Sequence, residues 1–184
     1  DIFARGDVGE YKSMGIFRTN KTYVDPETNE FLGLEAKSIA KAKVKAVNGE
    51  VVTLNVQRSN SEILQGDRLL PTDDRTINSM FHPSEPETKI NGYMIDVVNG
   101  VSQIGQYAVV VINKGERDGV KEGNVLAVYK KGGIVQDPYT KEKIELPADR
   151  AGVLMVFRTF DKMSYGLVLK ALRPLSLMDE VRNP

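Results

Sequence analysis

The chain contains no cysteine and no tryptophan, and it has a single histidine, His82. The lack of cysteine excludes disulfides, zinc–thiolate sites and thiol nucleophiles. Lysine plus arginine equals aspartate plus glutamate at 25 each, so no global positive field draws the chain to nucleic acid or to an anionic membrane. No apolar run approaches the roughly 20 residues of a membrane-spanning helix.

The sequence also lacks the usual motifs of catalytic and ligand-binding sites. His82 lies in "MFHPS", with no G-x-S-x-G elbow beside it to supply a serine nucleophile. Gly132-Gly133 is not followed by the Lys-Ser/Thr of a phosphate-binding loop. The acidic residues do not follow the Asp-x-Asp-x-Asp-Gly spacing of a calcium loop. We therefore expect a protein that is not an enzyme, with no catalytic residue, no cofactor and no metal.

Strand patterns dominate the chain, and no segment keeps a 3.6-residue period over three turns. Residues 41–47 alternate between lysine and small apolar residues, which is typical of a half-buried strand. Residues 108–112 and 153–157 are unbroken apolar runs, typical of strands covered on both faces. Strands are predicted at 41–47, 50–57, 92–98, 106–112, 124–130, 151–160 and 163–172.

Between residues 71 and 91 the sequence contains three prolines, many polar residues and few β-branched residues. Such a stretch is typical of a linker between two units. We predict a mainly β protein with two similar small β-barrel-like or β-sandwich-like units. The first unit covers residues 1–72, the linker 73–91, and the second unit 92–184 with two additional N-terminal strands.

An internal repeat supports this division. The phrase Asp-Pro-x-Thr-x-Glu occurs at residues 25–30 and again at 137–142. A shift of 112 also superposes "MGIFR" on "LAVYK" and places Arg5 on Arg117. Two copies of one β-unit are the interpretation of this pattern, because identities clustered in this way are not expected by chance.

The hairpins inside the two copies are predicted in detail. The first should turn through the three-residue loop Val47–Gly49, with Gly49 at positive φ. In the second copy the odd residues form the more apolar face, which predicts a one-residue register slip. This slip predicts a second three-residue loop at 160–162 and a core that contains Met155, Phe157, Tyr165 and Leu167.

The repeated phrase predicts turns rather than a doubled catalytic site. Proline fixes φ near −65°, and the aspartate carboxylate can accept a backbone N–H two residues further on. We expect Asp25 and Glu30 to lie on a solvated loop, away from any partner group. The residues predicted to form structural turns are Asp25, Pro26, Asp118, Gly119, Asp137 and Pro138.

Two groups of residues are candidate contacts for a partner or a glycan. Lys41, Lys43 and Lys45 form a row that either binds an anionic polymer or is the solvated face of a sheet. Met80 and Phe81 are apolar residues in a polar linker, and they either pack under a domain or anchor a partner.

Long segments resemble a family of Gram-negative envelope proteins. The pattern N-x-G-x-x-D-G-V-x-x-G in residues 113–123 resembles part of the C-terminal domain of the flagellar assembly protein FlgT. Residues 100–130, 137–171 and 179–184, together with "GDRLLP" at 66–71, are similar to the region downstream of the LysM domain in the type IV pilus secretin-associated (TsaP-like) proteins.

This resemblance implies a role without a defined site. In that family the LysM domain binds peptidoglycan, and the protein surrounds or anchors the outer-membrane secretin through which pili pass. The expected location is the periplasm, and the expected partners are the secretin and, through an upstream LysM domain that is not in this chain, peptidoglycan. A place in a ring or multi-subunit assembly is also expected, and no nucleic acid. The alternative is a glycan-binding envelope module without a secretin partner.

Overall fold

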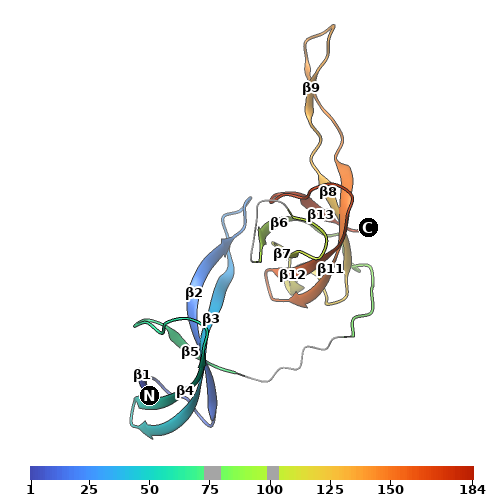
Figure 1. The fold of residues 1–184 in the computed structure, drawn as a ribbon. Helices are drawn as coiled ribbons and strands as arrows, with labels where there is room; N and C mark the ends of the chain where they lie inside the picture. Colours follow the sequence, from blue (N-terminus) through green and yellow to red (C-terminus); the bar gives the residue numbers. More distant parts are fainter. Residues whose placement is uncertain (73–79, 99–103) are drawn as a thin grey trace. The chain divides into compact units, whose positions relative to one another are not determined.

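The structure is a computed structural model that describes residues 1–72, 80–98 and 104–184 (Figure 1). The protein is mainly β, as predicted, and the described residues contain one short 3-10 helix, η1 (Glu116–Asp118). Two compact units are present. The first holds residues 1–23 and 34–72; the second holds residues 24–33 and the described residues from 80 onward.

The first unit is built on a five-stranded antiparallel sheet with the order β1-β4-β3-β2-β5. Its strands are β1 (Ile2–Arg5), β2 (Ser13–Val24), β3 (Phe31–Asn48), β4 (Val51–Ser59) and β5 (Arg68–Pro71). Alternate residues point inward and form a small core around Ile16, Ile39 and Leu54. β1 and β5 are the two edges of this sheet.

The second unit is a closed six-stranded barrel with the order β11-β12-β7-β6-β13-β8 (Figure 1). Its strands are β6 (Asn91–Val97), β7 (Val109–Ile112), β8 (Val125–Lys130), β11 (Asp149–Thr159), β12 (Ser164–Ala171) and β13 (Glu180–Arg182). The apolar runs predicted to be covered on both faces supply much of its core, including Val110, Ile112, Leu154 and Val156, all of them fully buried.

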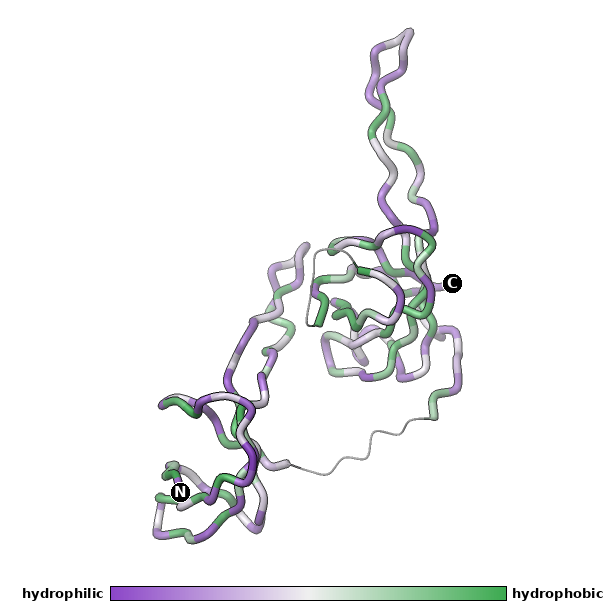
Figure 2. Tube along the Cα trace, in the orientation of Figure 1, coloured by the Kyte–Doolittle hydropathy of each residue, from purple (hydrophilic) through white to green (hydrophobic). Residues whose placement is uncertain are grey.

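A two-stranded hairpin, β9 (Ile134–Gln136) with β10 (Lys143–Glu145), extends away from the barrel (Figure 1). It follows β8 along the chain and leads into β11. Its apolar segments lie below a hydrophilic tip (Figure 2). Ile134 and Ile144 are 69% and 47% exposed, so these strands do not contribute to a core.

The two units share the same strand pairing at a constant offset. Val44 pairs with Leu54, and Val156 pairs with Gly166, 112 residues further on. The β3–β4 and β11–β12 pairs agree in this way along their length, including the positions of two register shifts. Ile16 opposite Leu69 likewise corresponds to Val128 opposite Val181.

The predicted register slip is therefore wrong. Leu154, Val156 and Val168 are fully buried in the barrel core. The residues predicted for that core are only half-buried: Met155, Phe157, Tyr165 and Leu167. A bulge in each hairpin adds a residue within the strand, and this reverses which residues face inward.

The same bulges shorten both hairpin loops. Asn48 pairs with Val51, which leaves a two-residue loop instead of the predicted Val47–Gly49 loop. Gly49 does have positive φ, at 60°, as predicted. In the barrel Phe160 N–H donates to the Met163 carbonyl at 2.8 Å, so that loop also contains two residues, not the predicted 160–162.

The seven predicted strands are all present, with shifted ends. The largest shift is at 106–112, where the strand begins at Val109 because Tyr107 has positive φ (66°), which interrupts an extended chain. Within the predicted linker, residues 73–79 lie outside the described residues. Ile90, at its end, is 2% exposed in the barrel core, and Ser84 bridges to Asn124.

Candidate functional site: an open seam and two acidic hairpin tips

The five-stranded sheet of the first unit matches the barrel with one strand removed. Without β6, the barrel order reads β7-β12-β11-β8-β13, which corresponds strand by strand to β1-β4-β3-β2-β5. In the barrel, β6 pairs with β13 on one side and with β7 on the other. Among the described residues no strand occupies the equivalent place between β5 and β1, so the first unit has an open seam.

A cleft of about 690 Å³ lies along this seam. Both edges line it, with residues 2–5 of β1 and Arg68 and Leu69 of β5. Phe3 and Leu64, also in the lining, are 75% and 48% exposed. The β1–β4 register equates Phe3 with Val111 of the barrel, which is fully buried. An exposed aromatic residue beside unpaired backbone is a typical feature of a protein-binding edge.

One rim of the cleft is held by an ion pair. Arg18 donates Nε and Nη2 to the two carboxylate oxygens of Asp67, at 2.7 and 2.8 Å. The Arg18 guanidinium, followed by the Leu64 N–H, lowers the pKa of Asp67 to about 2. The loop that carries Leu64 is thereby fixed to β2.

The tip of the β2–β3 hairpin, residues 24–33 (tip 1), lies against the barrel within the second unit. Asp25 is 5% exposed: its Oδ1 accepts the N–H groups of Glu27 and Thr28, and its Oδ2 accepts Asn113 Nδ2 at 2.8 Å. Burial raises the pKa of Asp25, but these hydrogen bonds outweigh it, and the net pKa is lowered. The turn role of Asp25 and Pro26 fits the prediction, whereas the solvated position does not.

Glu30 is the second anchor of tip 1. Arg117 donates Nη1 and Nη2 to its two carboxylate oxygens at 2.8 and 2.7 Å, and Lys162 Nζ lies 2.8 Å from Oε1. Arg117 first, then Lys162, lowers the pKa of Glu30 to about 2. The expected absence of partners for Glu30 is wrong, because residues distant in sequence form the site. We call Asn113, Arg117 and Lys162 the socket; Tyr93, whose hydroxyl donates to Glu27 at 2.8 Å, lies at its edge.

The outer hairpin ends in a second tip with the same internal geometry, residues 137–142 (tip 2). Asp137 Oδ1 accepts the N–H groups of Tyr139 and Thr140, as Asp25 does from Glu27 and Thr28. Lys141 has φ of 62°, and its counterpart Asn29 has φ of 58°. The Thr140 and Tyr139 N–H groups lower the pKa of Asp137. Asp137 and Pro138 thus form the predicted turn.

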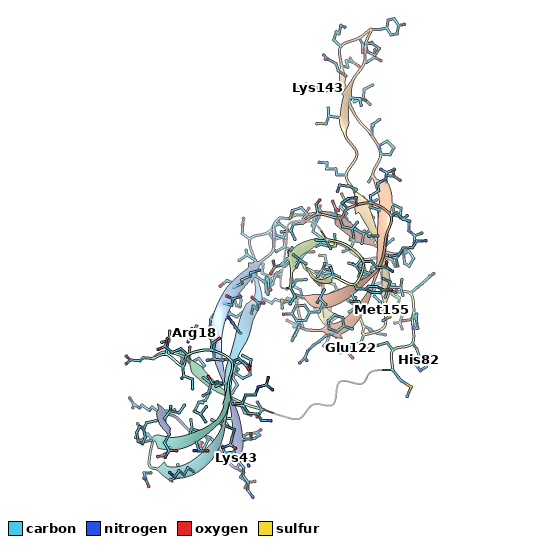
Figure 3. The ribbon with its side chains drawn as sticks, viewed as in Figure 1. Arg18, Lys43, His82, Glu122, Lys143 and Met155 are labelled. Carbon is cyan, nitrogen blue, oxygen red and sulfur yellow. The ribbon has the colours of Figure 1, made fainter. Side chains whose placement is uncertain are left out.

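Tip 2 differs from tip 1 in its surroundings. Within the described part of the chain, neither Asp137 Oδ2 nor the Glu142 carboxylate contacts a cation or an amide donor, and Tyr139 is 92% exposed. The side chains of the hairpin, including Lys143, project into solvent (Figure 3).

The other predicted residues are spread over the surface. Lys41, Lys43 and Lys45 lie exposed on β3, and Lys45 Nζ is 2.5 Å from Asp1 Oδ2 (Figure 3). Met80 is 81% exposed, whereas Phe81 is half-buried. Asp118 and Gly119 end η1, with Gly119 at φ of 90° and Asp118 accepting the Gly115 N–H. The seam and the socket had no separate sequence signal, because pairing between distant strands creates both.

Among the described residues, no three or more His, Asp or Glu side chains are arranged to hold a metal ion. The described residues also contain no helix long and apolar enough to cross a membrane. No protein-family model matches the chain, and no curated protein matches it significantly. The functional argument therefore depends on the seam, the tips and the sequence resemblance.

Proposed function

We propose that this chain is a non-enzymatic assembly module of the Gram-negative periplasm. It associates with the outer-membrane secretin of the type IV pilus machinery and helps to anchor it to the cell wall, through a LysM domain upstream of this chain. The resemblance of residues 100–130 and 137–171 to the secretin-associated proteins supplies the partner.

The open seam is the observation that best supports a protein-binding role. Free N–H and C=O groups on β1 and β5 can each pair with an added strand, and the barrel illustrates how β6 satisfies the equivalent strands. Phe3 and Leu64 supply exposed apolar surface beside those edges. Aromatic anchors of this kind contribute strongly to interfaces when a partner covers them.

Co-purification with the detergent-solubilised secretin tests this proposal. The chain should be retained by the immobilised secretin, and Phe3→Lys with Leu64→Lys should weaken retention by about tenfold or more, as expected for loss of an interface anchor. Val47→Lys is the matched control, because Val47 is 51% exposed in the same unit but does not line the cleft. No retention, or equal loss in the control, argues against the seam as the binding surface.

Glycan binding is the alternative function, and the exposed lysine row favours it. Lys41 lies opposite Arg58 in the β3–β4 pair, so the row carries an additional cation. A pull-down on purified cell-wall sacculi discriminates between the two functions. Under this alternative the chain sediments with sacculi, and changing Lys41, Lys43 and Lys45 to glutamate abolishes sedimentation. A chain that stays in the supernatant is evidence against it.

A further inference from the structure

We propose that tip 2 is an intermolecular ligand for the socket of a second copy of this chain. In the structure the socket already binds one Asp-Pro-x-Thr-x-Glu tip, through Asp25 and Glu30. Tip 2 carries the same two acidic residues at the same spacing, as Asp137 and Glu142. This inference is independent of the proposed association with a secretin.

The match between the tips extends to their backbone geometry. In each, the first aspartate N–H donates to the carbonyl of the final glutamate, at 2.8 Å in tip 1 and 2.9 Å in tip 2. In each, the N–H of the residue with positive φ donates back to the aspartate carbonyl, at 2.9 and 3.0 Å. Tip 2 is therefore preorganised in the conformation that binds the socket, so docking costs little further ordering of its backbone.

Tip 2 also leaves unused the groups that tip 1 uses for docking. Asp25 Oδ2 accepts from Asn113, whereas Asp137 Oδ2 has no donor among the described residues. Glu30 is held by Arg117 and Lys162, whereas Glu142 is exposed. Tyr139 takes the place of Glu27, which would put its ring beside Tyr93 of the second copy.

The barrel of a second copy fits this tip better than its five-stranded unit does. The strand registers equate Lys162 with Glu50 and Asn113 with Arg5, and those two residues form an ion pair with each other at 2.8 Å. β1 matches β7 at an offset of 108, but Val8 matches Val120 at 112, so the barrel has four more residues here. Those residues include η1 with Arg117, and the sequence alignment of Arg5 with Arg117 is therefore wrong.

Tip 1 competes with the incoming tip for the same socket. It is part of the same chain, and its effective concentration is on the order of millimolar. Association of the wild-type chain should therefore be weak, and it should strengthen when tip 1 is disabled. Docking of tip 2 on a second copy is a heterologous contact, which builds a ring if the rotation closes and an open chain if it does not.

Sedimentation of the 184-residue chain tests the exchange without any other protein. Glu30→Gln removes the ion pairs of tip 1 and leaves the Asp25 turn in place, so it should raise the association constant about tenfold or more. Adding Glu142→Gln to Glu30→Gln should return the chain to the monomer. Adding Asp149→Asn instead should leave association unchanged, because Asp149 lies at the base of the same hairpin and pairs with Arg173.

A cross-link keeps the test decisive if the association is too weak to sediment. The chain lacks cysteine, so Tyr139→Cys in one copy and Tyr93→Cys in another provide a single disulfide pair. In the Glu30→Gln background the mixed disulfide should form, and Glu142→Gln should abolish it. A Glu30→Gln chain that forms neither assembly nor disulfide at up to about 1 mM overturns the proposal, as does association that Glu142→Gln leaves intact.

Discussion

Arg117 holds Glu30 with two parallel hydrogen bonds, from Nη1 to Oε1 at 2.8 Å and from Nη2 to Oε2 at 2.7 Å. This bidentate geometry is the strongest form of an arginine–carboxylate contact. It joins a turn whose residues form a sequence motif to a helix that has no counterpart in the first unit. The repeated motif thus produces one docked turn and one undocked turn.

Asp25→Ala should destabilise the barrel unit more than Asp137→Ala does. The first change leaves the Asn113 amide buried without its acceptor, which costs about 1–3 kcal/mol. The second removes only turn hydrogen bonds at an exposed tip. Urea denaturation of the two variants gives both free energies of unfolding. Equal losses would show that the contact with Asn113 contributes nothing.

Docking of tip 1 should weaken in acid. The pKa of Glu30 is lowered from an ordinary value of 4.5 to about 2, so its contribution to stability is complete above about pH 4.5. That contribution is lost as pH falls through 2, where the bound carboxylate becomes protonated. Carboxyl carbon NMR titration should give a midpoint near 2 for Glu30 and a higher midpoint in an Arg117→Gln variant. A midpoint for wild-type Glu30 near 4.5 contradicts the ion pairs.

Local sequence patterns were sufficient to predict the β class, the strands and the turn role of Asp25 and Asp137. They failed where an extra residue inside a strand alters the alternation. Met155 and Phe157 make an apolar face on paper, but the bulge before Arg158 turns them outward. A bulge depends on the partner strand, so the spacing of apolar residues alone does not reveal it.

The candidate site was less predictable than the fold. The lysine row was identified from its charge, whereas the socket combines residues 113, 117 and 162 with a tip near residue 30. The seam depends on the absence of one pairing partner, which no residue in β1 or β5 encodes. Exposed Phe3 was the available signal, since an aromatic in a short strand is ordinarily buried.

Hydrogen exchange should distinguish the open sheet from the closed barrel. Backbone amides on the free edges of β1 and β5 should exchange about tenfold or more faster than those of β7 and β13, which β6 covers. Amides between β3 and β4 serve as the internal control, because they are paired in the same unit. Equal protection of β5 and β13 would mean that the seam is covered in solution.

The cores of the two units carry complementary changes in side-chain volume. Three equivalent inward positions hold Ala4, Ala42 and Leu54 in the open sheet, but Ile112, Leu154 and Gly166 in the barrel. A Cβ on Gly166 would lie 2.9 Å from Leu154 Cδ1 and 3.3 Å from Ile112 Cδ1. The leucine of one unit thus fills the space that two larger neighbours fill in the other.

Gly166→Leu should therefore destabilise the barrel by overpacking, by about 1–3 kcal/mol or more. Leu154→Ala should cost about 2–5 kcal/mol by leaving a cavity. The double variant should lose less than the sum of the two, with a coupling of about 0.5–3 kcal/mol, because the new leucine occupies the vacated volume. Unfolding free energies of the four proteins complete the cycle. Strict additivity would mean that the two positions do not share one packing space, and that the equivalence of the two cores is wrong.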